Sequence, residues 1–219
     1  MKKVQFPTIL TWNVDTVNII DYDGFMSDSS YHHGNLKEAL IAAGLKILSE
    51  NGIEGLSLRK VAREVGVSHS APYNHFPDKQ SLLAAISTAG FEQLYMKLSE
   101  TFSTAKASST AVMFEIAWTY LQFALEDPGR FRLMFSGALE VETDHPTYVA
   151  ISQKNITLLE EIILYCQRTG ELDGGNSTNH AIRIWSSVHG FTNLVLEDQF
   201  PEGYIHSRKL KDLLKVALS

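Results

Sequence analysis

Long apolar runs and cysteines are scarce in this sequence of 219 residues. Charges interrupt every apolar stretch, and none approaches the roughly 20 residues needed to cross a bilayer. The single cysteine, Cys166, excludes an intrachain disulfide and a zinc site built from cysteines, and its spacing from Ile162 and Ile163 favours an inert thiol in a core or interface. No secretory signal is expected, because polar residues break up the N-terminal apolar residues. The predicted location is therefore the cytoplasm.

Strand signals are absent as well. Nowhere do apolar and polar residues alternate over the length of a strand between turn signals, and no internal repeat is visible. With 44% hydrophobic residues, the chain is long enough to bury a sizeable core. We therefore expect an all-α fold of about nine helices. The predicted helices are Gly34–Asn51, Ser57–Val65, Ser68–Phe76, Asp78–Phe102, Ala111–Asp127, Arg130–Ser136, Pro146–Arg168, Thr178–Gln199 and His206–Leu218.

Composition divides the chain into an arm and two domains. Residues 1–30 are rich in Asn, Asp, Thr and Ser without a helical period, which is typical of a flexible arm. Met26 offers a second start, so it stays open whether residues 1–26 belong to the natural protein. Residues 31–90, called the head below, hold the short helices, and residues 91–219, called the body, hold most of the longer ones. The polar stretch Ser103–Thr110 is predicted to be the linker between the two regions.

The net charge of −6 argues against a protein that coats nucleic acid without selection, since such proteins are usually basic. The acidic excess lies outside Ser27–Gly90, where acidic and basic residues balance. The basic residues there are Lys37, Lys46, Arg59, Lys60, Arg63 and Lys79, and the acidic ones are Asp28, Glu38, Glu50, Glu54, Glu64 and Asp78. The distribution of charge therefore matters more than its total for any contact with nucleic acid.

The first three predicted helices have the layout of a helix-turn-helix unit. Gly66 supplies the positive φ that the turn requires, and Ser57 and Ser68 are predicted to cap the second and third helices. The third helix then presents short or planar polar side chains, which suit a major groove better than a core. The residues expected to pack beneath it are Leu58, Val61, Ala62, Val65 and Val67.

Three stretches at fixed spacing carry a resemblance to a known family. They are NGIEGLSLRKVAREVGVS at Asn51–Ser68, YNHF at Tyr73–Phe76 and DKQSLL at Asp78–Leu83. Together they resemble the DNA-binding region of the TetR/AcrR family of repressors over Leu36–Ile86. The resemblance implies a head that binds duplex DNA and a body that binds a ligand and forms a dimer.

Carried over position by position, the resemblance also implies the residues that contact DNA. The residues expected at base edges are His69, Ser70 and Ala71. The residues expected at phosphates are Ser57, Arg59, Tyr73, His75 and Lys79. Two interpretations of Asn74 stay open, a bidentate contact to adenine and a solvated or phosphate-bound amide.

Two features near the predicted recognition helix need separate treatment. Pro72 falls in its first turn, where the missing N–H removes at most one hydrogen bond but stiffens the start of the helix. His32 and His33 invite a metal site, but adjacent residues of a helix point to different faces and no carboxylate or cysteine stands at ligand spacing. We therefore expect neither a metal nor a cofactor, and favour hydrogen bonds from these histidines to phosphate.

The predicted helix Ala111–Asp127 is apolar almost all round, so we expect it to be buried on more than one side. Its aromatic surplus can line a cavity for an apolar ligand, and plain core packing stays open as the alternative for each residue. The candidate ligand contacts are Phe114, Trp118, Phe123, Phe131, Trp185 and His189.

A second resemblance covers most of Ala111–Phe200. It rests on YLQFALEDP at Tyr120–Pro128, FRLMF at Phe131–Phe135 and WSSVHG at Trp185–Gly190, and it points to the TetR subgroup whose C-terminal domain is named for Trp, His and Gly. His189 is either satisfied in the core or hydrogen-bonded to an effector, and Gly190 would permit another helix to approach closely. No strained nucleophile, carboxylate pair or Gly-rich phosphate loop accompanies His189, so an enzyme is not expected.

In the resembled family the last two helices dock against their copy, which implies a homodimer. Its heads would lie about 34–36 Å apart, over successive major grooves of a near-palindromic operator. The favoured function is a repressor released from its operator by a small apolar effector, without membrane contact. The alternative is a ligand- or protein-binding helical module that does not read DNA, which the balanced charge of the head slightly favours. Repression and activation both stay open.

Overall fold

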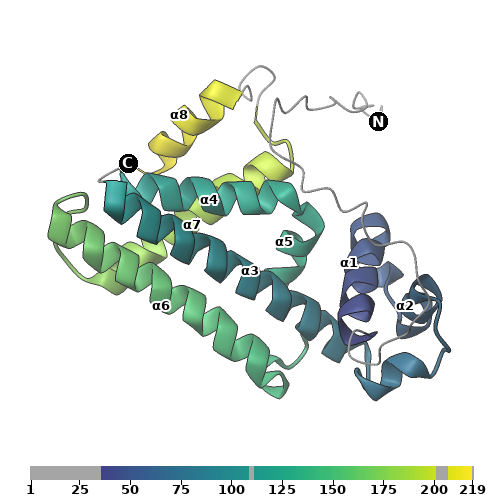
Figure 1. Cartoon of the computed structure of the whole chain (residues 1–219). Coiled ribbons are helices and arrows are strands. Elements are labelled where there is room, and N and C mark those ends of the chain that lie inside the picture. Colours follow the sequence, from purple (N-terminus) through teal and green to yellow (C-terminus); the bar gives the residue numbers. More distant parts are fainter. Residues whose placement is uncertain (1–35, 109–110, 201–206, 219) are drawn as a thin grey trace. The chain divides into compact units, whose positions relative to one another are not determined.

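The computed structural model describes residues 36–108, 111–200 and 207–218 (Figure 1). The predicted arm, His32 and His33 lie outside these residues. The α-helices are α1 (Leu36–Gly55), α2 (Leu58–Val65), α3 (Lys79–Ser108), α4 (Val112–Glu126), α5 (Pro128–Met134), α6 (Pro146–Thr169), α7 (Ser177–Leu196) and α8 (Ser207–Leu218), with short 3-10 helices at Ala71–Asn74 and Glu142–Asp144. Within the described ranges there is no strand, which confirms the all-α prediction. None of these helices is both long and apolar enough to cross a membrane.

The second helix of the head follows its predicted capping signals. Ser57 is extended (φ −151°, ψ 150°), and its hydroxyl accepts a hydrogen bond from the Lys60 N–H. Gly66 ends α2 at φ 76°, a left-handed conformation that glycine adopts without steric cost. The first helix runs beyond its predicted end at Asn51 to Gly55, with a break at Gly52 (φ 66°, ψ −176°).

The predicted recognition helix Ser68–Phe76 is wrong in extent, because only Ala71–Asn74 is helical and that turn is a 3-10 helix. Ser70, the residue before it, makes no capping hydrogen bond, and the Ser68 hydroxyl pairs with the Ser70 hydroxyl instead of capping a helix. Pro72 has no N–H and is fully buried, so it anchors the turn to the core. His75 and Phe76 both donate their N–H to the Pro72 carbonyl.

The predicted linker is also wrong over Ser103–Ser108, where α3 continues as helix. Ala105 is buried in the body, and the rings of Phe102 and Tyr165 pack edge to face at 5.5 Å. The Lys106 ammonium lies over both rings. These contacts with α6 explain why a stretch of small polar residues stays helical.

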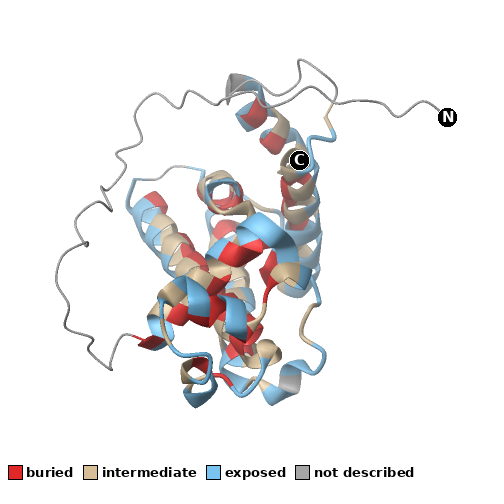
Figure 2. Cartoon of the chain, turned by 90° about the vertical axis from the view of Figure 1, so that its right-hand side faces the viewer, coloured by how far each residue is buried: buried red, intermediate tan, exposed pale blue. Residues whose placement is uncertain are grey.

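Two apolar clusters meet along α3. The head cluster gathers buried residues of α1, α2 and the first part of α3 up to Ile86, and the body cluster begins at Phe91. Figure 2 marks the buried positions of the helices in red. The short helix α5 belongs to both, since Leu133 packs in the head cluster while Phe131 and Met134 pack in the body cluster. A Cβ on Gly90 would lie 2.5 Å from the Met134 sulfur, so glycine permits the close approach of α3 and α5.

Candidate functional site

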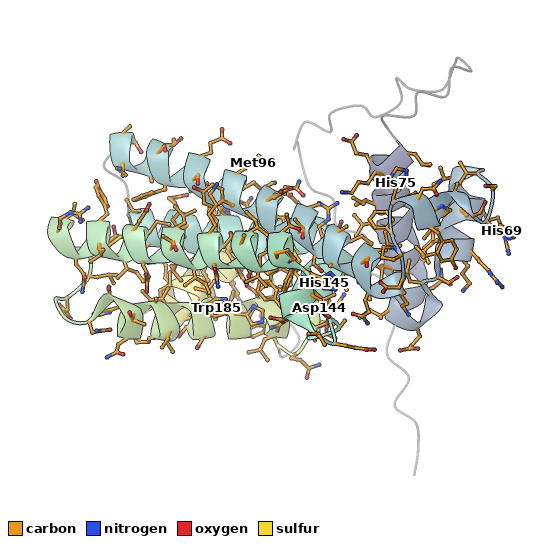
Figure 3. All side chains as sticks on the ribbon, turned by 90° about the horizontal axis from the view of Figure 1, so that it is seen from below. His69, His75, Met96, Asp144, His145 and Trp185 are labelled. Carbon is orange, nitrogen blue, oxygen red and sulfur yellow. The ribbon has the colours of Figure 1, made fainter. Side chains whose placement is uncertain are left out.

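The turn around Ala71–Asn74 exposes four of the nine predicted DNA-contact residues. His69, Ser70, Tyr73 and Asn74 are exposed, and the Tyr73 side chain is 50% accessible. Ala71 and His75 are half-buried. Figure 3 shows His69 at the outer edge of the head. Four of these six neighbouring residues are therefore accessible, although the helix that carries them is shorter than predicted.

The other predicted phosphate contacts differ in whether their side chains already form hydrogen bonds within the protein. Arg59 is exposed on α2, and Ser57 is held as the N-cap of that helix. Lys79 begins α3, but its ammonium donates to the Ile53 carbonyl at 2.6 Å and so ties α3 to the end of α1. Lys60, which was not a candidate, similarly donates to the Gly55 carbonyl at 2.8 Å. Arg59 is therefore the predicted cation whose charge is least engaged in the protein.

A cavity of about 410 Å³ lies inside the body among α3, α4, α6 and α7, with the end of α5 as a further wall. Its volume falls in the range of pockets that hold small organic ligands. Most of its walls are apolar, with Phe91, Leu94, Ile116, Met134, Tyr148 and Val188 among the lining residues. The cavity is therefore suited to an apolar ligand.

The structure brings only one of the six predicted ligand contacts directly to this cavity. Trp185 lines it from α7 and is 40% exposed. The rings of Phe131 and His189 lie in the layer behind it, centred 5.6 Å apart. Phe123 is buried in the core. Phe114 and Trp118 lie under the ammonium groups of Lys215 and Lys211 of α8, away from the cavity wall.

His189 is enclosed by aromatic rings. Its Nδ1 lies 2.9 Å from the Tyr120 hydroxyl, and its ring centre lies 4.7 Å from that of Phe135 and 6.3 Å from that of Trp185. Burial lowers the pKa of His189 and raises that of Tyr120, while a hydrogen bond from Trp185 acts in the opposite direction on Tyr120. The hydrogen bond between Tyr120 and His189 thus lies directly behind one side of the cavity.

The sequence pattern missed the polar residues of the cavity wall. These are Glu142 in the loop between α5 and α6, and Ser152 and Asn155 on α6. The Asn155 side-chain N–H groups donate to the carbonyls of Phe91 and Ile151, both at 3.0 Å. Its Oδ1 is buried without a partner among the described residues. No local spacing marks these residues, because they face the cavity only after α6 has packed on α3.

The loop between α5 and α6, Phe135–His145, touches both the cavity and the head. Gly137 and Glu142 line the cavity. The Glu140 N–H donates to the Gln80 side chain of α3 at 3.2 Å. Hydrogen bonds from Ser81 hold the pKa of Asp78 below its usual value, and His145 of the loop lowers it further. Figure 3 shows Asp144 and His145 between Trp185 and the labelled residues of the head.

Comparison with known proteins defines the class. Residues 40–86 match the family described as bacterial regulatory proteins, tetR family. Residues 113–216 match the family described as tetracyclin repressor-like, C-terminal domain. The two matches together cover more than half of the chain. The chain belongs to the TetR family of DNA-binding transcriptional regulators.

Individual relatives agree with this class. The HTH-type transcriptional regulator YobS of Bacillus subtilis is 25% identical over 168 residues, which cover 76% of this chain and 82% of YobS. A solved structure of a Rhodococcus protein of unknown function is 30% identical with a TM-score of 0.72, over 87% of this chain and 95% of that one. FadR of Bacillus subtilis, solved in complex with stearoyl-CoA, shares the fold at 18% identity and a TM-score of 0.64, over 83% of this chain and 95% of FadR.

Proposed function

We propose that this chain is a repressor that leaves its operator when a small apolar molecule fills the cavity of the body. The observation that carries the proposal is the position of α5. Met134 lines the cavity, and its neighbour Leu133 is buried in the apolar cluster of the head. Because packed interiors transmit small displacements, a ligand that pushes on this wall also acts on the head.

The exposed turn at the tip of the head supplies the proposed DNA contacts. His69, Ser70 and Ala71 would face base edges, and Tyr73 and His75 would donate to phosphates. Arg59 and the N-terminus of α2, capped by Ser57, would hold a further phosphate. Asn74 is exposed and free for either base or phosphate. Lys79 would contribute its remaining N–H groups while it stays bound to Ile53.

A second connection supports the coupling between cavity and head. The loop between α5 and α6 lines the cavity through Glu142, and its Glu140 N–H donates to the Gln80 side chain near the start of α3. The long helix α3 begins at Lys79 in the head and passes the cavity wall at Leu98. A coupling free energy of ~1–3 kcal/mol between the two sites would lower the affinity for DNA about 5–150-fold.

We propose that α7 and α8 form the contact between two copies of the chain. Ile182, Trp185 and Leu194 on α7 and Val216 on α8 are exposed apolar residues, whereas Val188, Leu210 and Leu214 are buried in the chain's own core. Nothing lies within 4 Å of a Cβ placed on Gly190, so this part of α7 is open to a second helix. A twofold dimer would present two heads to one near-palindromic operator.

Three further observations support details of the proposal. Trp185, His189 and Gly190 lie on neighbouring turns of α7, as expected for the Trp-His-Gly subgroup. The stearoyl-CoA bound by FadR shows that this fold accommodates an apolar chain in another protein. The two apolar clusters, which meet between Ile86 and Phe91 on α3, support a domain boundary near Gly90.

A gel-shift titration with the DNA that flanks the gene tests the DNA-binding part of the proposal. Arg59→Ala should weaken binding by about tenfold and reduce the salt dependence by about one phosphate contact. Arg168→Ala, which removes the same charge from an exposed position of α6, is the matched control and should change little. Tyr73→Phe should weaken binding on every sequence, because a phosphate donor is lost. A purified chain that binds no fragment at low ionic strength would instead be the helical module that does not read DNA.

A further inference from the structure

The polar groups of the cavity define which end group its ligand carries. We infer, on the basis of the proposed function, that the cavity binds an apolar molecule ending in a neutral or cationic hydrogen-bond donor. The same groups disfavour a carboxylate or a phosphate.

The described wall of the cavity contains no positively charged side chain. Among the described residues that line the cavity, Glu142 is the one charged side chain, and none is lysine, arginine or histidine. An anionic end group would therefore lose its hydration without gaining a cationic partner, which is costly in an apolar site. His145, the one basic residue of the loop that carries Glu142, does not line the cavity.

Glu142 also gives the cavity its attraction for a cation. It is exposed in the short helix Glu142–Asp144, and its charge raises the pKa of Tyr148 beyond the larger effect of burial. Tyr148 lines the same cavity. The carboxylate therefore acts on the cavity from its rim, where water screens it in part, so its contribution to binding a cation is modest.

The side-chain donors of the wall are few and uncharged. The Tyr120 hydroxyl pairs with His189 Nδ1. The Ser152 hydroxyl donates to the Val149 carbonyl. The Tyr148 hydroxyl and the Trp185 N–H are further donors, and neither carries a charge that could compensate an anion.

Asn155 provides the buried acceptor. Both carbonyls that its amide contacts require a donor, so its N–H groups must face them and its Oδ1 must point elsewhere. That oxygen is buried, lacks a partner within the described residues, and belongs to a residue that lines the cavity. A buried acceptor without a partner is unfavourable. Because this oxygen is closed off from solvent, a ligand donor reaches it only after a small shift of the wall, and it then gains the missing bond.

Calorimetric titration of the full chain at neutral pH with four probes of equal chain length tests the inference. The probes are decylamine, decanol, decanoate and methyl decyl ether, each below the concentration at which it forms micelles. Decanoate should bind at least about tenfold more weakly than decanol, because its charge has no partner in the wall. The ether, which accepts but does not donate, should bind about threefold to tenfold more weakly than decanol.

Two loop variants test whether the charge of Glu142 itself attracts the amine. Decylamine should bind about two- to fivefold more tightly than decanol, and Glu142→Gln should abolish this advantage. Glu140→Gln removes the same charge from the same loop but not from the cavity wall, and it should leave the advantage in place.

The outcomes separate this inference from the proposed function. Decanoate or the ether binding as tightly as decanol would overturn the assigned ligand class while leaving the cavity as a ligand site. Absence of binding by all four probes would overturn both. Binding in the expected order without release of operator DNA would support the ligand class and refute the ligand-responsive repressor.

Discussion

The N-terminus of α4 is capped by a residue far away in the sequence. The residue before the helix is Ala111, which has no side chain able to accept a hydrogen bond, and it makes no capping contact. Glu171, in the loop after α6, accepts instead from the N–H groups of Val112 at 3.0 Å and Met113 at 2.8 Å. Its negative charge also lies at the positive end of the helix dipole. We predict that Glu171→Gln destabilises the protein.

The magnitude follows from these contacts. The substitution removes the charge and replaces one accepting oxygen by an amide donor, which cannot bond to an N–H. Loss of a capping acceptor costs about 0.5–2 kcal/mol, and loss of the helix-dipole interaction costs about 0.3–1 kcal/mol at exposed sites. Because Glu171 is exposed, we expect the free energy of unfolding to fall by about 1–1.5 kcal/mol, in the lower half of the summed range.

The assay is urea unfolding followed by helical circular dichroism at one fixed protein concentration, since association would otherwise shift the midpoint. In a thermal scan the same loss corresponds to about 2–6 °C for a chain of this length. Glu161→Gln, an exposed change of the same charge on α6, is the matched control and should stay within about 0.5 kcal/mol of wild type.

A capping residue introduced next to α4 tests whether loss of the Glu171 cap causes the destabilisation. Ala111→Ser supplies a hydroxyl at the N-cap, so in the Glu171→Gln background it should restore about 1 kcal/mol. In the wild-type background the N–H groups are already satisfied, and the gain should be less than half as large. Equal gains in the two backgrounds, or a Glu171→Gln variant as stable as wild type, would refute the capping argument.

Three further predictions concern single residues. Gly66→Ala places a Cβ at φ 76° and should destabilise the protein by about 1–2 kcal/mol in urea unfolding, whereas Gly66→Asn should cost less because asparagine tolerates this conformation. Burial lowers the pKa of His189, so below its ordinary value near 6.5 the unfolded chain binds a proton that the folded chain does not; thermal stability should fall from neutrality toward about pH 5. His189→Asn should flatten that part of the profile and the exposed-site control His69→Asn should not, and an unchanged slope in His189→Asn would contradict the assignment. Burial, with a smaller effect of Glu171, raises the pKa of Cys166 to about 12, so the native thiol should react with a disulfide reagent only as fast as the protein opens. Rapid labelling of folded protein would show that the thiol is accessible.

Local signals predicted most helices correctly. Ser57 and Gly66 bound α2, and Pro146 and Gly170 bound α6, within one residue of the predicted limits. These signals act through hydrogen bonds and backbone conformations of neighbouring residues, so they can be read without knowledge of the rest of the chain. The apolar residues Leu58, Val61 and Ala62 of α2 likewise lie buried as predicted.

Predictions that depended on distant partners were less reliable. The stretch Ser103–Ser108 is polar enough for a linker, but contacts of Phe102 and Ala105 with the body keep it helical. Phe114 and Trp118 have the aromatic character of a cavity wall, yet α8 covers them with lysine side chains. Periodicity shows that a helix face is apolar, but it does not show which element packs against that face.

The sequence by itself determined the helical class, most helix limits and the family, because local hydrogen bonding and residue spacing encode all three. The tertiary structure decided that the residues proposed to meet DNA lie on a short exposed turn and not on a full helix. Only the tertiary structure decided where the cavity lies, that Glu142 and Asn155 belong to its wall, and that α5 joins the cavity to the head. The physical reason is that a cavity is the space left when helices from distant parts of the chain pack together, and its lining depends on their relative positions.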